Sequence, residues 1–446
     1  MIETDQPIAP RAVESRKAAS SNGAFFWLCA FYFVYCARPE DWIKPLAFIP
    51  FAKITAVFAL LGLLSSLGRT KRRFRDLPRE SNYLLALIGV LFASALLSPI
   101  WKGGALLHTI DFAKVYVVWV LTFLLVTDFS RLRRIVFIQA GSVAVISIVS
   151  LLLGHNRPRL EGVIGGIYSN PNDLAFAIVL TLPFSLAFLL TAKGALARLC
   201  WAGAILIMGL TLFMTASRAG FITLVISGTV CLWHFGVKGR RFYLIVTSTL
   251  AVVLLLAVAG GPLITRMTAI AGNADTQLGA VAYGSYEARE YLMFRALDGI
   301  KHYPILGLGP RNFPVYSGIW HDVHMTYLQI AVEGGIPSLV LYLLFFASAF
   351  RNLRKLRRRR DLDLHTTLFV GGLHSSMIGF VIGALFAPEA YQFFPYFSAA
   401  YTSALVAMIK QRDGVSEPSP TGKDWRSRYG MVRAGKRKSG DFTLVH

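Results

Sequence analysis

Residues 320–339 read WHDVHMTYLQIAVEGGIPSL, and this stretch joins a cluster of titratable side chains to the start of a long apolar run. The run continues to about residue 349 with few charges. A helix that spans a bilayer needs about 20 consecutive, mostly apolar residues. The stretch therefore predicts a membrane-spanning helix that carries His321, Asp322 and His324 at one end.

The composition of the whole chain agrees with a membrane protein. Of its 446 residues, 55% are hydrophobic and only 16% are charged, and the mean hydropathy is +0.54. Soluble globular chains carry about 25% charged residues. The 46 Lys and Arg exceed the 24 Asp and Glu, and in a membrane protein this excess indicates cytoplasmic loops rather than nucleic-acid binding. The four cysteines have no CxxC spacing, so the sequence predicts neither a disulfide framework nor a zinc site.

Hydropathy predicts an all-α polytopic membrane protein with about 12 transmembrane helices. The first apolar run has no small-residue cleavage site after it, so we interpret it as a retained helix rather than a signal peptide. The predicted helices cover residues 22–37, 46–67, 82–101, 110–126, 134–153, 173–191, 198–214, 218–236, 242–262, 325–349, 365–387 and 394–410.

The charges between these runs predict the orientation of the chain. Basic segments fall at every second connection, and the connections between them carry few Lys or Arg. Because basic loops stay on the cytoplasmic side, both termini are predicted to be cytoplasmic. The basic segments are 68–80, 130–134, 192–198, 237–241 and 350–363.

The twelve predicted helices and the connections between them predict the domain organisation. Residues 21–262 form the first nine membrane helices, 263–324 form a large, partly helical periplasmic loop, and 325–410 form the last three helices. The polar and basic composition of residues 1–20 and 411–446 predicts disordered cytoplasmic tails. Within the loop, the stretch SYEAREYLMFRALDGIKHYP (285–304) predicts an amphipathic helix or two short helices.

The titratable cluster at the outer end of the tenth helix has several interpretations. Asp322 suits a cap for the first helical turn, because a carboxylate accepts hydrogen bonds from free backbone N–H groups. His321 and His324 are spaced to share a helical face, but the HExxH zinc signature is absent. A histidine at this depth is either an interfacial ring or a group for proton transfer near neutral pH.

Arginines gather on the same predicted side of the membrane. Arg218 lies in the short connection between the seventh and eighth helices, and the loop contains Arg289, Arg295 and Arg311. An arginine at an apolar edge is costly unless it snorkels or binds an anion. A guanidinium offers phosphate two parallel hydrogen bonds. Together with an imidazole, these side chains predict a site for an anionic lipid with a phosphate or diphosphate head.

Two polar features inside the predicted helices complete the pattern. Glu333 is expected to be paired or functional because a carboxylate at that depth is costly, and the GGIP that follows it predicts a loosened or kinked helix. The stretch YSNPNDLAF (168–176) opens the sixth helix, with Asn172 or Asp173 expected as its cap.

Three motifs, in order, resemble the O-antigen ligase and O-antigen polymerase superfamily of bacterial inner-membrane glycosyltransferases. They are TASRAG (215–220), KHYPILGLGPRNF (301–313) and HMTYLQIAVEGGIPSL (324–339). The resemblance assigns the essential histidine to His324, the helix-edge arginine to Arg218 and the loop arginine to Arg289.

This chain departs from the family pattern at three positions. Met325 stands where the family usually has Asn, Met293 where it often has Trp, and Arg311 where it usually has Gly. The two methionines put the specificity for the acceptor in question. Arg311 and His321 are expected to add contacts to the substrate.

The resemblance implies a reaction without a metal ion or other cofactor that inverts the anomeric carbon. The donor would be a glycan linked through diphosphate to undecaprenol, and the acceptor a sugar hydroxyl on lipid A–core or on a growing glycan. The implied location is the bacterial inner membrane with the active face in the periplasm. A chain-length regulator is a further expected partner.

Several alternatives remain open. Within the superfamily, the sequence does not separate a ligase, a polymerase and a protein O-oligosaccharyltransferase. A metal-dependent glycosyltransferase of the GT-C type would place acids in the first outer loop, where Glu40 and Asp41 lie. A flippase or transporter for lipid-linked glycans would fit twelve helices. Such proteins usually show related halves and charges near the midplane, whereas here the outer loop is large, the polar groups gather at one membrane face and we find no repeat between the halves.

Overall fold

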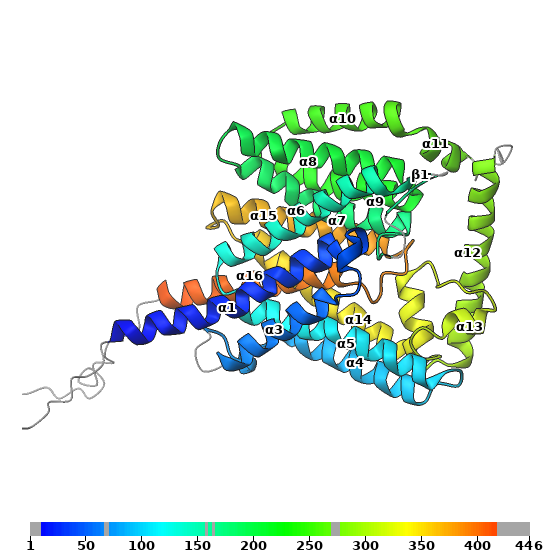
Figure 1. Cartoon of the computed structure of the whole chain (residues 1–446), viewed down its shortest axis with the longest axis horizontal. Helices are drawn as coiled ribbons and strands as arrows, with labels where there is room; N and C mark the ends of the chain where they lie inside the picture. Colours follow the sequence, from blue (N-terminus) through cyan, green and yellow to red (C-terminus); the bar gives the residue numbers. More distant parts are fainter. Residues whose placement is uncertain (1–9, 67–70, 157–158, 163–165, 269–276, 417–446) are drawn as a thin grey trace, which may run out of the picture.

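The computed structural model describes residues 10–66, 71–156, 159–162, 166–268 and 277–416, and within these ranges the chain is almost entirely helical. Most helices run side by side in one bundle (Figure 1). The elements are α1 (Pro10–Ala37), α2 (Pro39–Trp42), η1 (Lys44–Leu46), α3 (Phe51–Ser65), η2 (Phe74–Asp76), α4 (Arg79–Leu96), α5 (Lys102–Leu125), α6 (Phe129–Leu153), β1 (His155–Asn156), β2 (Leu160–Glu161), α7 (Pro171–Thr191), α8 (Ala195–Met214), α9 (Arg218–Leu232), η3 (Trp233–Val237), α10 (Tyr243–Ala259), α11 (Gly261–Thr268), α12 (Gln277–His302), α13 (Phe313–Ser317), α14 (Thr326–Arg358), α15 (Leu364–Gly383) and α16 (Phe393–Ser416).

A helix is present at each of the twelve predicted apolar runs. Within the described residues, seven helices are long and apolar enough to cross a membrane: α5, α6, α7, α8, α9 with η3, α14 and α15. The pair α10 and α11 is bent by 84° and would add an eighth span if it crosses as one unit. The chain is therefore a multi-pass membrane protein, and the count of twelve spans stays a prediction.

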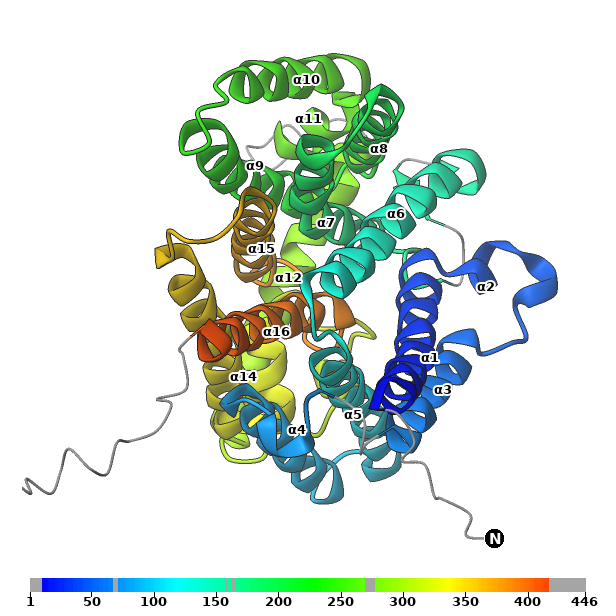
Figure 2. The same ribbon diagram turned by 90° about the vertical axis from the view of Figure 1, so that its left-hand side faces the viewer.

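Helix α16 shows why composition alone does not identify every helix of the bundle. It packs against α5, α14 and α15, and Figure 2 shows it near the centre of the bundle seen end-on. Its tyrosines find partners inside the protein: Tyr401 donates to the Gln139 side chain at 2.8 Å, and Tyr396 donates to the Ala390 carbonyl at 2.7 Å. A helix surrounded by other helices needs no lipid-facing apolar surface, so it tolerates these polar groups.

Small residues allow α15 to approach its neighbours closely. A Cβ atom on Gly383 would lie 1.9 Å from the ring of Phe176 on α7. On another face, the Ser227 hydroxyl of α9 donates to the Ser375 carbonyl at 2.9 Å. Close backbone approach and hydrogen bonds between helices are the usual means of packing helices in a membrane, where water does not drive association. These contacts fix α7, α9 and α15 relative to one another.

Helix α14 is broken at Gly335, which adopts φ of 76°. The kink that GGIP predicts is therefore confirmed. Next to the break, the Leu308 and Gly309 amides donate to the Val332 and Glu333 carbonyls at 2.8 and 2.9 Å. The glycines of the GLGP turn thus let an extended segment lie against the broken helix, because a Cβ at Gly307 would lie 2.5 Å from the Glu333 carbonyl carbon.

The two ends of the bundle differ in structure. The long helix α12 lies across one end, roughly perpendicular to the bundle (Figure 1), and confirms the predicted amphipathic helix as a single element. We name this the α12 end. At the opposite end, which we name the α16 end, α1 begins and α14 and α16 end (Figure 1).

The predicted tails are only partly described. Residues 10–20 belong to α1 and 411–416 to α16, so these parts of the predicted disordered tails are helical, because each terminal helix extends past its apolar run. Residues 1–9 and 417–446 lie outside the described residues.

Candidate functional site

A cavity of about 570 Å³ lies between the start of α9, the middle of α12 and the residues that precede α14. Arg218, Arg289 and His324 all line it, so the structure brings together the three side chains to which the sequence assigns the chemistry. The remaining lining residues are largely apolar: Ala219, Ile222, Met267, Tyr286, Glu290, Met293, Val323, Met325, Leu385 and Phe386.

Arg218 is positioned by a tight turn at the start of α9. Ala216 adopts a left-handed φ of 47°, and Ser217 caps the helix by accepting a hydrogen bond from the Gly220 amide at 3.1 Å. The Arg218 guanidinium donates to the Arg266 backbone carbonyl of α11 at 3.3 Å. The turn and the bond to α11 hold this guanidinium at the wall of the cavity.

Arg289 reaches the cavity from α12, the helix that lies across the bundle. Its pKa is lowered from the usual value by burial and then by the nearby Arg218. Two guanidiniums that line one cavity form a site that an anion would stabilise. Glu290 is the one carboxylate among the lining residues, so the described wall of the cavity has an excess of positive charge.

His324 lies two residues ahead of α14, and the first residue of that helix fixes its position. The Thr326 amide donates to the Ala384 carbonyl at 2.8 Å, and the Thr326 hydroxyl donates to the Ala387 carbonyl at 2.7 Å. The pKa of the His324 imidazole is lowered to about 4 by burial, by Arg289 and by His321. At neutral pH the ring is therefore neutral, and its buried Nδ1 has no hydrogen-bond partner within the described part of the chain.

Arg159 is a cavity neighbour that the sequence analysis missed. It donates to the Thr215 carbonyl at 2.8 Å and to the Asn172 side chain at 3.1 Å. Its pKa is lowered to about 9, first by burial and then by Arg266 and Arg289. The sequence does give an indication of its role. Arg159 lies in a connection that the positive-inside rule predicts to be periplasmic. An arginine is unusual on that side, as it is for Arg218.

Arg266 is the second missed arginine. It is buried, with 4% of its surface exposed, and its Nε has no hydrogen-bond partner among the described residues. Arg159, Arg218, Arg266 and Arg289 lie close enough to interact electrostatically, and we name this group the arginine cluster. Four cations this close to one another favour the binding of an anion.

Two predicted contact residues do not line the cavity. Arg311 pairs with Asp322 at 2.5 Å, and His321 is near enough to lower the pKa of His324 without lining the same space.

The predicted helix caps are wrong. Asp322 does not cap α14, which follows Met325 with no side-chain cap, because Asp322 is turned toward Arg311. At α7 the cap is Asn170, not Asn172 or Asp173, since the Asn170 side chain accepts from the Asn172 amide at 2.9 Å.

The remaining acidic residues singled out by the sequence have partners. Glu333 is fully buried and accepts a hydrogen bond from the Tyr391 hydroxyl at 2.6 Å. Glu40 and Asp41 both pair with Arg38, at 3.1 and 3.0 Å. In the described part of the chain, no group of three or more His, Cys, Asp or Glu side chains is arranged to hold a metal ion.

Comparison with known proteins identifies the region that contains the site. Residues 203–343 match a family model described as O-antigen ligase. This range includes Arg218, Arg289 and His324, and the match confirms the resemblance carried by the three motifs. The chain is also similar to a protein named exopolysaccharide production protein ExoQ from Rhizobium meliloti, with 25% identity over 276 residues. That alignment covers 56% of this chain and 59% of the relative's length.

Proposed function

We propose that this chain, which matches the O-antigen ligase family over residues 203–343, transfers a glycan from an undecaprenyl-diphosphate donor to a sugar hydroxyl. The observation that carries the proposal is the meeting of Arg218, Arg289 and His324 at one cavity. The transfer would take place at the α12 end, which the positive-inside rule predicts to be periplasmic.

The arginine cluster would hold the diphosphate. A guanidinium donates two parallel hydrogen bonds to phosphate oxygens, and it remains charged at any physiological pH. Arg218 and Arg289 line the cavity and would contact the diphosphate directly, whereas Arg159 and Arg266 add positive charge behind them. As the bond from the anomeric carbon to the diphosphate oxygen breaks, negative charge grows on the leaving group, and fixed cations stabilise that charge.

His324 would act as the general base. The acceptor hydroxyl gives its proton to an imidazole nitrogen, and its oxygen attacks the anomeric carbon from the face opposite the diphosphate, so the configuration inverts. A pKa of about 4 makes a weak base. A bound diphosphate would offset the positive charge of Arg289, and would thereby raise the pKa of His324 toward the working pH. Binding of the donor would thus make His324 a stronger base before the acceptor reacts.

The apolar wall would separate this chemistry from water. Met293 and Met325, which replace the aromatic and amide residues usual in the family, both line the cavity. Methionine is flexible and fills irregular spaces. We propose that these two side chains shape the space for the acceptor sugar.

The test is transfer of a labelled glycan by purified protein in proteoliposomes. We expect Arg218→Ala, Arg289→Ala and His324→Ala each to lower the rate by about a hundredfold or more. Lys301→Ala is the matched control, because Lys301 is exposed on α12 and does not line the cavity. Near-normal transfer by Arg218→Ala, with Lys301→Ala also normal, would contradict the proposal.

The acceptor has two candidates. The name of the relative refers to exopolysaccharide production, which favours a growing glycan as the acceptor and hence a polymerase. The family description names a ligase, for which lipid A–core would be the acceptor. Deletion of the gene separates them: loss of a polymerase leaves a single capped repeat at the cell surface, whereas loss of a ligase leaves free core and accumulated lipid-linked polymer.

A further inference from the structure

A second cavity, of about 280 Å³, lies at the α16 end of the bundle. Its wall is formed by η3 and the turn that follows it, by the end of α14 and by the start of α15. Helix α9 and η3 connect the two cavities, because Arg218 at the start of α9 lines one and His234 in η3 lines the other. The sixteen residues from Arg218 to Trp233 span about 24 Å of helix, so the cavities are separate sites.

The second cavity is strongly cationic. Lys238, Arg241, Arg357 and Arg359 line it, and its lining includes no Asp or Glu. We name it the basic cavity. Such a concentration of like charge is unfavourable without an anion, and the wall supplies none.

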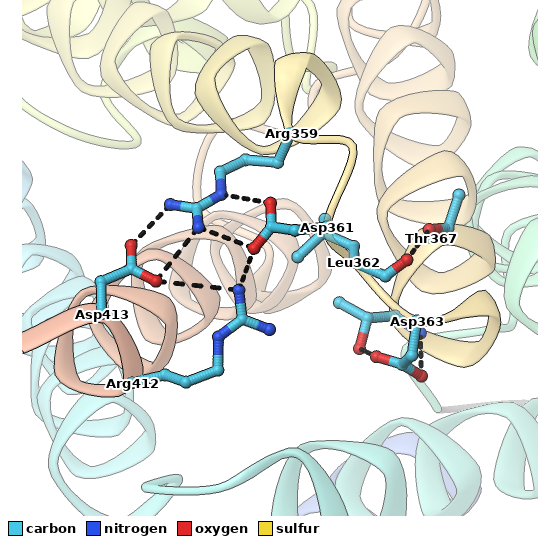
Figure 3. Close-up of polar contacts among 8 residues, drawn as sticks. Arg359, Asp361, Leu362, Asp363, Thr367, Arg412 and Asp413 are labelled. Carbon is cyan, nitrogen blue, oxygen red and sulfur yellow. Dashed lines mark hydrogen bonds and ion pairs between the residues drawn. The ribbon is translucent and has the colours of Figure 1, made fainter. Parts of the chain in front are cut away.

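Within the described ranges, Arg359 is the one of these cations that pairs with carboxylates. It binds Asp413 at 2.6 and 3.0 Å and Asp361 at 2.7 and 2.8 Å, and Arg412 contacts the same two carboxylates (Figure 3). Asp361 and Asp413 are thereby occupied by Arg359 and Arg412. Among the described residues, no ion pair joins a carboxylate to the other three cations of the cavity, Lys238, Arg241 and Arg357.

Two histidines hold Arg357 at the edge of the basic cavity. Arg357 lies 2.9 Å from Nε2 of His374, and since a guanidinium only donates, this nitrogen accepts. His374 therefore carries its proton on Nδ1 and donates to Nε2 of His234 at 3.0 Å. A further proton on either ring would set two N–H groups against each other. The chain of bonds thus requires neutral rings, which leave Arg357 with its full charge.

The surroundings of the basic cavity match the depth of lipid headgroups. Trp233, Phe242 and Tyr243 are exposed beside it, and aromatic residues of this kind concentrate where the membrane meets water. Leu356, Leu362 and Leu368 supply an apolar part of the wall. A ligand that fits has a phosphate for the cations and a hydrocarbon body for the leucines and the rim.

We propose that the basic cavity binds the phosphate of an anionic membrane lipid, in the leaflet at the α16 end. The site shares no lining residue with the cavity of Arg218, Arg289 and His324, so it does not depend on the proposed transferase reaction. Positive-inside orientation predicts that this leaflet is cytoplasmic, where anionic headgroups attract basic residues near the surface.

The experiment uses the full chain in mild detergent and native mass spectrometry to measure binding of phosphatidylglycerol, with phosphatidylcholine as the uncharged comparison. The test variant is the triple change Lys238→Gln, Arg241→Gln and Arg357→Gln. The matched control is Arg354→Gln, Lys355→Gln and Arg360→Gln, which removes the same charge from exposed residues at the same end that do not line the cavity.

We expect the test variant to weaken phosphatidylglycerol binding about tenfold or more and the control less than about twofold. The single variant Lys238→Gln changes an exposed residue, so it keeps the fold and should still weaken binding. Equal losses in test and control, or no preference for phosphatidylglycerol over phosphatidylcholine, would overturn the proposal. The last measurement uses inorganic phosphate in place of the lipid. Binding of inorganic phosphate without any binding of phosphatidylglycerol would assign the cavity to a free anion, and would also overturn the proposal.

Discussion

Ser217 donates a hydrogen bond to Asn172 across 2.8 Å, and this contact joins the first turn of α9 to the first turn of α7. The same Asn172 oxygen accepts from Arg159 at 3.1 Å. Ser217 precedes Arg218 and caps its helix. One amide oxygen thus fixes the position of Arg159 and of the turn that presents Arg218.

Replacement of Asn172 is therefore expected to disturb the arginine cluster without removing any charge. Asn172→Leu removes the acceptor shared by Ser217 and Arg159, and we expect donor KM to rise about tenfold, with a smaller fall in kcat. Asn172→Asp keeps an acceptor oxygen and should restore most of the affinity. Steady-state kinetics with varied donor provide the measurement, and equal damage from both variants would argue against a positioning role.

Arg218 and Arg289 are expected to be coupled energetically, because both line the cavity that we propose holds one diphosphate. In a double-mutant cycle, the loss in kcat/KM for Arg218→Ala with Arg289→Ala should be smaller than the product of the two single losses. The reference cycle combines Arg289→Ala with Lys301→Ala. In that double variant, the loss in kcat/KM should equal the product of the two single losses. Independent effects of the two arginines would indicate that they bind different groups.

The pH dependence of the reaction should report His324. A base works only when deprotonated, so activity is expected to fall as pH drops through the pKa of the imidazole. In the free protein that pKa is about 4, so the acid limb of kcat/KM should lie near pH 4. The acid limb of kcat should lie at higher pH. A bound donor would place negative charge next to Arg289, and this charge would raise the pKa of His324. Coincident limbs, or an unchanged profile in His324→Gln, would contradict this role.

Gly335 is expected to be intolerant of any side chain. Its φ of 76° favours glycine, and a Cβ there would lie 2.1 Å from the Ile305 carbonyl oxygen. We expect Gly335→Ala to lower the free energy of unfolding by about 2 kcal/mol or more. Gly141→Ala is the control, since that helical position has open space around it. Thermal unfolding in detergent compares the two, and a stable Gly335→Ala protein would mean that the break in α14 is adaptable.

Arg311 provides a test of the contact role that the sequence assigns to it. It pairs with Asp322 and does not line the cavity of Arg218, Arg289 and His324, and exposed ion pairs contribute only about 0–1 kcal/mol. We expect Arg311→Ala to change transfer less than about threefold. A loss as large as that of Arg289→Ala would assign it to the substrate instead.

The sequence predicted most of what depends on hydrophobic pattern and on local motifs. Apolar runs located the helices, because exposure to lipid demands apolar side chains over a fixed length. The three motif residues meet at one cavity because each lies where a helix begins or crosses at the α12 end. The predicted kink after Glu333 is present because glycine alone adopts the required φ without strain.

What depends on tertiary contacts was not predictable in the same way. Asp322 was expected to cap α14, yet a guanidinium eleven residues earlier in the chain is its partner. Arg159 and Arg266 join the cluster through contacts between distant segments, and only their unusual side of the membrane gives a signal. Helix α16 carries polar groups whose partners lie on other helices, so its composition understates its burial.

The bend at Gly260 links the arginine cluster to the surrounding bilayer. Helix α10 packs mainly on α8 and presents Val246, Leu250 and Val258 outward, while α11, directly across the 84° bend, supplies the carbonyl that holds Arg218. A change in the tilt of α10 would therefore move the carbonyl that holds Arg218. A helix longer than the hydrocarbon is thick accommodates the mismatch partly by tilting, so we expect the thickness of the bilayer to influence the position of Arg218.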